Sequence, residues 1–182
     1  MSTATEQSIG TGNWTIDKVH SHVGFAVKHM VVATFRGRFD EYDGALVVDE
    51  QGPRLEGSVN VDSIVVKDEN LAAHLRAPDF FDVARFPEIR FVSSTVDVGE
   101  QGELEVEGDL TIKDRTHRVT ARGAINGPHV DIAGNEKIGV ELETVVDRRE
   151  FGLEWNAELP KGGYAVDNDV RLEVSLELVR EA

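Results

Sequence analysis

Three histidines near the N-terminus have a spacing that could support metal chemistry. His20 and His22 would project from one face of a strand, whereas His29 has the opposite parity and cannot converge with them from one straight strand. A cupin-like site would also need a glutamate a few residues after the second histidine, where Ala26 and Val27 stand. We therefore predict no metal site and interpret His20 and His22 as strand-face residues with local hydrogen bonds.

Nucleophilic catalysis finds little support in the sequence. The chain has no cysteine, which removes thiolate nucleophiles, disulfides and cysteine-type zinc sites. No G-x-S-x-G motif is present, and nothing links a serine to a histidine and a carboxylate. The 34 acidic residues are too many for one catalytic pair to be singled out. We predict no catalytic residue, no cofactor and no enzymatic activity.

Charge and hydropathy bear on partners and location. The formal net charge is −15, which argues against a nucleic-acid partner because phosphate binding is driven by clustered lysine and arginine. No window approaches the roughly 20 apolar residues that span a bilayer. The polar N-terminus lacks the basic start and apolar run of a secretory signal. These features predict a cytoplasmic protein with no integral membrane segment.

The elements that must position any site are β-strands. Apolar and polar residues alternate with a period of two at residues 23–27, 104–112, 138–144 and 170–178, which is typical of strands with one buried face. About eight such segments, joined mainly by short turns without βαβ alternation, predict an all-β antiparallel sheet. A sheet of this many strands either splits into a sandwich or closes into a barrel. Closure into an eight-stranded barrel would remove exposed edges and leave room for side chains or one small ligand. The apolar–polar alternation changes phase after Phe39, and this change predicts a bulge between Asp40 and Gly44.

The connection at residues 74–91 contains more phenylalanine and proline residues than a simple turn requires. Good helix formers precede it, and Pro78 can open a further helical turn. We therefore predict one or two short helices around residues 67–86. Phe80 and Phe81 are adjacent, so they point in different directions and one of them packs inward.

The length of 182 residues suits one sizeable core. Residues 1–12 are small and polar, and we predict that they form a disordered arm. Residues 13–180 are predicted to form a single barrel domain.

Four separated motifs carry a resemblance to a known family. They are WTIDKVHSHVGFAVKHM, HLRAPDFFDVARFPEIRF, VEGDLTIKDRTHRVT and DRREFGL. In this order and spacing the chain resembles the YceI-like proteins over nearly all of residues 14–178. The resemblance implies a lipocalin-like barrel that binds a polyisoprenoid or related long-chain lipid in an elongated internal cavity.

If the alternating apolar sets point inward, they predict the lining of that cavity. The predicted lining residues are Phe25, Val27, Phe39, Phe91, Leu110, Ile112, Val140, Leu142, Leu172 and Val174. Phe80 or Phe81 would close one end, and Trp155 would act as a lid or plug. His29 and Arg148 are the candidates to hold a polar head group, with Arg36 and Arg38 as weaker ones. The opposite interpretation is that these arginines pair only with nearby acidic residues.

The same apolar side chains could instead fill the barrel as an ordinary core. Gly24, Gly108 and Gly123 favour a cavity, because glycines inside strands would leave room or admit bends. We predict a lipid carrier or buffer in transport. The alternatives are an enzyme acting on an isoprenoid lipid and a stress-response or scaffold protein with a filled barrel. A homodimer is a further expectation from the resemblance.

Overall fold

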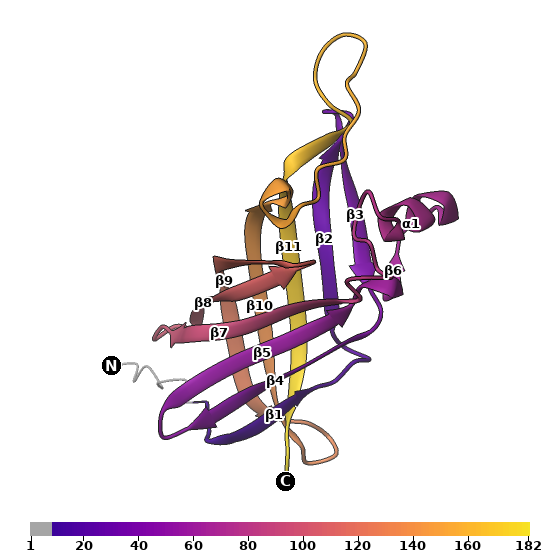
Figure 1. Cartoon of the computed structure of the whole chain (residues 1–182). Helices are drawn as coiled ribbons and strands as arrows, with labels where there is room; N and C mark the ends of the chain where they lie inside the picture. The colour runs from indigo at the N-terminus through magenta and orange to yellow at the C-terminus, as the bar shows by residue number, and fades with distance from the viewer. Residues whose placement is uncertain (1–8) are drawn as a thin grey trace.

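The computed structural model describes residues 9–182, and most of them lie in β-strands (Figure 1). Over these residues the strands are β1 (Gly12–Ile16), β2 (His22–His29), β3 (Ala33–Phe39), β4 (Tyr42–Asp49), β5 (Gly52–Asn60), β6 (Ile64–Val65), β7 (Glu88–Val98), β8 (Glu103–Ile112), β9 (Arg115–Val130), β10 (Glu136–Asp147) and β11 (Val166–Arg180).

Helical structure is limited to α1 (Glu69–Arg76) and two 3₁₀ helices within the described residues, η1 (Val61–Ser63) and η2 (Arg148–Phe151). The helix predicted before the aromatic connection is confirmed as α1. Its N-cap is Asp68, whose side chain accepts a hydrogen bond of 2.8 Å from the backbone N–H of Leu71.

The helical turn expected at Pro78 is absent. Residues 77–86 form hydrogen-bonded turns instead, in which the backbone N–H groups of Phe80 and Asp82 both donate to the carbonyl of Ala77 at 3.0 Å. Asp82 has a φ of +52°, and this left-handed conformation ends any helical run.

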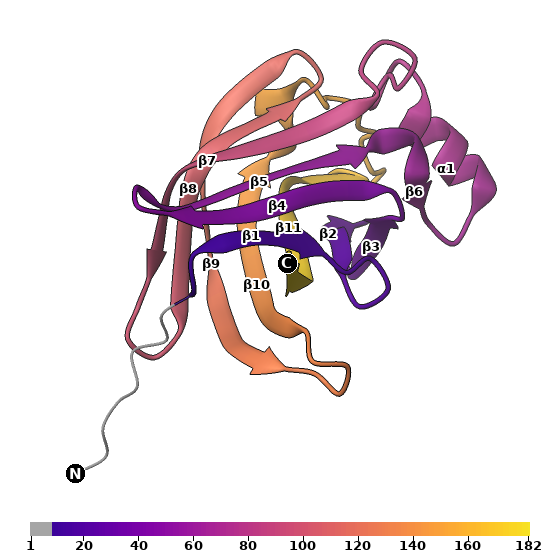
Figure 2. The same cartoon turned by 90° about the horizontal axis from the view of Figure 1, so that it is seen from below.

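The sheet closes on itself, and every strand pairing is antiparallel. The neighbours run β1-β4-β5-β7-β8-β9-β10-β11, and β11 pairs back onto β1 through Leu178 and Arg180. These strands form a closed eight-stranded barrel, so the predicted fold class is confirmed. Figure 2 shows the strands curving round until β1 lies beside β11.

The remaining strands extend the barrel beyond this ring. β2 continues along the edge of β11 that β1 occupies, with Val23 opposite Val174 and Val166 opposite His29. β3 pairs with β2, and β6 pairs with the end of β3. The six strands can be described as three long strands, each interrupted once. These are β1 with β2, β3 with β4, and β5 with β6. Figure 1 shows β2 and β3 rising above the ring.

The irregularity predicted between Asp40 and Gly44 is an interruption of the strand rather than a bulge within it. β3 ends at Phe39 and β4 begins at Tyr42. The two residues between them are held by residue 63, because Asp40 N–H donates to the Ser63 carbonyl at 3.2 Å and Glu41 N–H donates to the Ser63 hydroxyl at 2.9 Å.

Two groups of buried side chains make up the core. The first surrounds Trp14, Val106 and Leu178 where β1 meets β11. The second surrounds Val61 and Phe151 at the end that carries α1 and η2. Strand β8 shows how the sequence supplies them, because its residues alternate regularly between buried and more exposed positions.

The predicted arm at residues 1–12 falls partly outside the described residues, which begin at residue 9. Residues 9–12 already belong to the folded part. Ile9 packs against the first core group and β1 begins at Gly12, one position before the predicted start of the domain at residue 13.

Candidate functional site

An apolar cavity of about 180 Å³ lies inside the barrel, bordered by residues of both core groups. Its wall is built by inward-facing residues of the ring strands and of β2 and β3. Predicted lining residues that the structure places there are Phe39, Phe91, Leu110, Ile112, Leu142, Leu172 and Val174. The period-two patterns therefore bring together residues that are far apart in sequence.

Other apolar lining residues were not on the predicted list. They are Ile16, Val23, Tyr42, Ala45, Leu55, Val59, Ile89, Val119, Ala121, Leu176 and Leu178. Most belong to strands whose alternation is visible in the sequence, so the same signal could have found them. Leu55 and Val59 lie on β5, where η1 and β6 shift the phase beyond Asn60.

Val140, Phe25 and Val27 do not border the cavity. Val140 is almost fully buried and fills the first core group instead. Phe25 and Val27 lie on the part of β2 that extends beyond the ring. There the Phe25 ring packs against Phe39, with centroids 5.9 Å apart, and against Phe35 at 6.2 Å.

The aromatic connection and the segment after η2 meet outside the cavity. Phe80 is buried against Trp155 and His74, and the His74 and Trp155 ring centroids are 4.8 Å apart. Neither Phe80 nor Trp155 borders the cavity, so their placement differs from the predicted plug and lid. Phe81 packs edge-on against Phe39 at 6.3 Å and thereby supports the cavity wall from behind.

Arg148 is buried, and its guanidinium is engaged by polar groups of the protein. Nη1 donates to the carbonyls of Leu153 at 2.6 Å and Trp155 at 2.8 Å, and Nε donates to the carbonyl of Asp167 at 2.9 Å. Nη2 lies 3.3 Å from Oδ1 of Asn168. Burial lowers the pKa of this guanidinium. The arrangement ties the segment after η2 to the start of β11, and leaves Arg148 poorly placed for the predicted head-group contact.

The other predicted basic candidates also lie away from the cavity wall. His29 is exposed at the end of β2, and Arg36 is exposed on β3. Arg38 pairs with Asp40 at 2.8 Å. The cavity wall contains no lysine, arginine or histidine among the described residues, whereas Asp43, Glu56 and Glu143 contribute atoms to it.

The strand glycines act through close packing rather than by enlarging the cavity. A Cβ on Gly108 would collide with the Val92 carbonyl and the Phe91 ring, and one on Gly123 would collide with the Glu141 carbonyl. A Cβ on Gly24 would lie 2.6 Å from His22 Nε2 and 2.8 Å from the Gly37 carbonyl. The room that these glycines leave is taken by neighbouring protein atoms.

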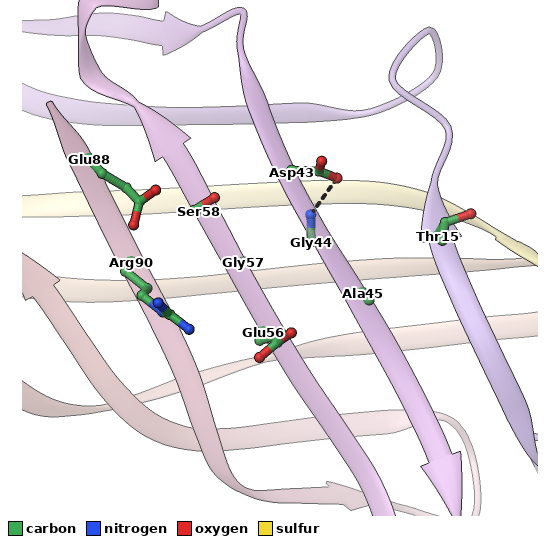
Figure 3. Close-up of a pocket in the computed structure, with 9 residues that line it drawn as sticks. All are labelled: Thr15, Asp43, Gly44, Ala45, Glu56, Gly57, Ser58, Glu88 and Arg90. Atoms are coloured by element: carbon green, nitrogen blue, oxygen red, sulfur yellow. Dashed lines mark hydrogen bonds between the residues drawn. The ribbon is translucent and has the colours of Figure 1, made fainter.

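A polar groove of about 430 Å³ lies on the outer surface of the same wall (Figure 3). Glu88 and Arg90 on β7, Glu56 on β5 and Asp43 on β4 border it. The β4–β5 wall is one sheet thick and includes the glycine pair Gly44 and Gly57. The groove is shallow and mixes both signs of charge, so its chemistry differs from that of the cavity.

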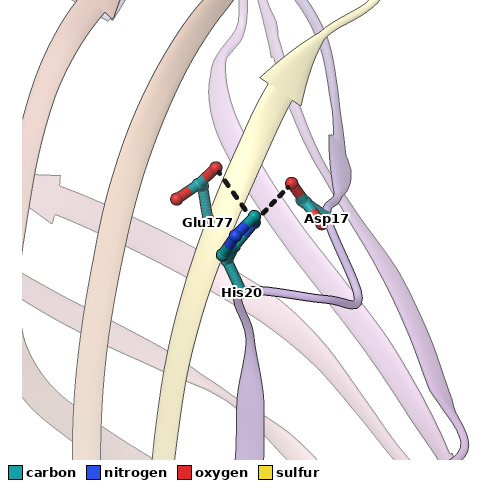
Figure 4. A group of neighbouring side chains, drawn as sticks. All are labelled: Asp17, His20 and Glu177. Atoms are coloured by element: carbon teal, nitrogen blue, oxygen red, sulfur yellow. Dashed lines mark hydrogen bonds and ion pairs between the residues drawn. The ribbon is translucent and has the colours of Figure 1, made fainter. Parts of the chain in front are cut away.

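Asp17, His20 and Glu177 have ligand atoms within 4.8 Å of one another, as a cation site would require (Figure 4). His20 Nδ1 lies 3.0 Å from Asp17 Oδ2 and 3.7 Å from Glu177 Oε1. Lys137 already supplies a positive charge, because its Nζ hydrogen-bonds to Glu177 and lies 3.5 Å from Asp17 Oδ2. We interpret the group as an ion-pair cluster that joins the β1–β2 connection to β10 and β11.

This cluster predicts a pH-dependent contribution to stability. The hydrogen bond to Asp17 raises the pKa of His20 above 6.5, and the hydrogen bond from His20 lowers the pKa of Asp17 to about 2. Because the folded-state pKa of His20 is raised, its contribution is present below pH 6.5 and is lost as the pH rises past the folded value. Urea unfolding should therefore show that His20→Gln lowers stability more at acidic than at alkaline pH.

The matched control for this prediction is a double-mutant cycle. In an Asp17→Asn background the principal partner of His20 is lost, so His20→Gln should have a much smaller pH-dependent effect. An equal effect in both backgrounds would contradict the assignment of the His20 pKa shift to Asp17.

Residues 9–182 include no helix with the length and apolar content needed to cross a membrane.

Comparison with known proteins gives consistent matches across the chain. The model of the YceI-like domain family matches residues 14–178. A UPF0312 protein of Staphylococcus aureus (strain USA300) is 32% identical over 169 residues, which cover 91% of this chain and 96% of that protein.

Solved structures show the same fold at lower identity. BcnA of Burkholderia cenocepacia superimposes with a TM-score of 0.75 at 20% identity, covering 89% of this chain and 98% of that one. A polyisoprenoid binding domain from Saccharophagus degradans, implicated in plant cell wall breakdown, has a TM-score of 0.70 at 12% identity, covering 92% and 98%.

Proposed function

The chain belongs to the YceI-like domain family, and from this membership and its apolar cavity we propose that it binds an isoprenoid or other long-chain lipid, as a carrier or buffer. The cavity is the observation that carries the proposal, because apolar side chains from strands all round the barrel converge on it. One structural neighbour is described as a polyisoprenoid binding domain, which supports the same ligand class.

The volume of the cavity indicates how much of a ligand it holds without rearrangement. A cavity of about 150 Å³ holds one benzene molecule and a water occupies about 30 Å³ of liquid, so about 180 Å³ accommodates on the order of six water-sized groups. A methyl or methylene group is of similar size. Without rearrangement the cavity therefore holds roughly six carbons of a ligand. A longer isoprenoid chain, farnesol included, would have to widen the cavity or protrude from it.

The charges of the wall favour a ligand with a neutral polar end. Its ionisable lining residues in the described chain are all acidic, and Arg148 is engaged elsewhere. The side chains of Asp43, Glu56 and Glu143 are exposed, so a phosphate is disfavoured here because the wall offers no cation to compensate its desolvation. We propose that an uncharged isoprenoid, such as an alcohol, binds better than the phosphate of the same chain.

Isothermal titration of the purified, delipidated protein with farnesol and with farnesyl phosphate tests this proposal. An apolar ligand of about 15 heavy atoms at roughly 0.3 kcal/mol each gains about 4–5 kcal/mol, which corresponds to a dissociation constant of roughly 1 mM or slightly below. Farnesol should bind one molecule per chain, and more tightly than the phosphate.

The other candidate functions predict different results. Absence of binding by farnesol, by its longer homologues and by fatty alcohols would support a filled-barrel scaffold. Recovery of a chemically altered lipid after incubation would support an enzyme. Recovery of the same lipid supports a carrier or buffer.

A further inference from the structure

The β2–β3 hairpin carries an exposed group of apolar side chains far from the cavity. Val31 is 66% exposed and Val32 is 84% exposed, with Met30 and Tyr164 exposed beside them. We call these four residues the apolar tip. Figure 1 shows the hairpin and the loop before β11 close together above the ring. Clustered exposed side chains of this size commonly mark an interaction surface.

The backbone of the tip is unfavourable for the residues it carries. Met30 has a φ of +50° and Val31 a φ of +66°. A hairpin turn with positive φ normally carries asparagine, aspartate or glycine, and a β-branched residue there is a marked outlier. We take a valine in this conformation as a reason to look for a role of its exposed side chain outside the fold.

The tip is held in place by contacts between two segments. The backbone N–H of Met30 donates to the carbonyl of Ala165 at 2.8 Å. Gly163 lies against Val31, since a Cβ on this glycine would be 3.4 Å from Val31 Cγ2. The side chains of the tip are therefore presented together by a fixed backbone.

The charge around the tip differs from that of the whole chain. Residues 28–36 and 157–165 contain three basic side chains, Lys28, Arg36 and Lys161, and one acidic side chain, Glu158. The whole chain has a formal net charge of −15. Apolar residues flanked by basic ones are typical of surfaces that enter the interface of a phospholipid bilayer.

A line of aromatic rings leads from this region toward the cavity. Phe35, on the strand that follows the tip, packs against Phe25, and Phe25 packs against Phe39. Phe39 borders the cavity. The β2–β3 extension thus carries a chain of packed aromatic rings from Phe35, three residues after Val32, to the cavity wall.

We propose that the apolar tip inserts into the surface of a phospholipid bilayer, and that the lipid ligand passes between bilayer and cavity along Phe35, Phe25 and Phe39. The transfer step rests on the proposed lipid-binding function, whereas insertion of the tip can be tested separately.

Flotation with vesicles of phosphatidylcholine and phosphatidylglycerol in equal parts tests insertion. The wild-type protein should float with the vesicles at about 0.15 M ionic strength, where repulsion between its net charge of −15 and the anionic surface is screened beyond about 8 Å. The double variant Val31→Asn, Val32→Ser should bind at least roughly tenfold less, because it removes two apolar side chains from the contact. Its thermal unfolding midpoint should be equal or higher, since asparagine tolerates the left-handed conformation better than valine.

Ile132→Ser is the matched control. Ile132 is fully exposed in the β9–β10 hairpin, at the opposite end of the barrel in Figure 1. Its neighbours include Asp131 and Glu136, and its loss should leave vesicle binding unchanged. Equal flotation of the wild type and the tip variant, or no flotation of the wild type, would overturn the proposal.

Two further measurements separate the other outcomes. A dimeric wild type whose tip variant is monomeric in sedimentation would identify the tip as a contact between two copies and overturn membrane insertion. Farnesol titration in the absence of vesicles should give the same affinity for the wild type and the tip variant. Tip-dependent flotation of a protein that binds no farnesol would support insertion but overturn the transfer of ligand.

Discussion

Replacing Ala121 with phenylalanine is expected to weaken farnesol binding roughly twentyfold without unfolding the barrel. Ala121 lies on β9 and borders the cavity. The new ring occupies the space of about six ligand atoms, which at roughly 0.3 kcal/mol each contribute about 2 kcal/mol. The ring enters existing space, so the thermal unfolding midpoint should stay near the wild-type value.

Val145→Phe provides the matched control for this experiment. Val145 lies on β10, one of the ring strands that form the wall, but its side chain is 56% exposed and does not border the cavity. The same aromatic group placed there should leave farnesol binding unchanged. Equal affinities of the Ala121→Phe variant and the wild type would show that farnesol binds elsewhere.

Replacing Gly123 with alanine should have the largest effect on stability. A Cβ at this position would collide with the backbone carbonyl of Glu141 on the neighbouring strand. A backbone group cannot rotate away as a flexible side chain can, so β9 and β10 would have to separate. We expect a loss of roughly 2–4 kcal/mol in the free energy of unfolding, measured with urea.

Gly139→Ala is the control for the effect of adding a methyl group to this strand pair. Gly139 lies on β10, and a Cβ there would approach only Asn126 Cβ, at 4.0 Å. The variant should be neutral or slightly more stable, because alanine restricts the unfolded chain more than glycine does. Similar losses for Gly123→Ala and Gly139→Ala would contradict the role assigned to the close approach at Gly123.

The period-two patterns of the strands were sufficient to predict an antiparallel sheet. The family resemblance then selected the closed eight-stranded barrel. The same patterns also identified part of the cavity wall, including Phe91 on β7 and Leu172 on β11. Whether these residues contact a ligand stays a prediction. The interruptions of the long strands were missed, because they depend on partners distant in sequence, such as Ser63 at Asp40.

Arg148, Phe80 and Trp155 were predicted to contact the ligand, but sequence patterns could not predict where their loops fold. Arg148 has the right chemistry for a phosphate, but its carbonyl partners come from two loop segments whose approach no local pattern reveals. Phe80 and Trp155 pack against each other and not into the cavity. Strand periodicity specifies which face a residue occupies, and it does not specify where an irregular connection folds back.

Native mass spectrometry tests most directly the claim that the cavity binds a lipid. The protein is purified from its own host, and its native mass is compared with its denatured mass and with an organic extract of the same sample. We predict one lipid adduct per chain that is lost on denaturation and recovered unaltered in the extract. If only the bare protein mass appears, and added isoprenoid or fatty-acyl chains leave it unchanged, the account of a lipid-binding cavity is contradicted.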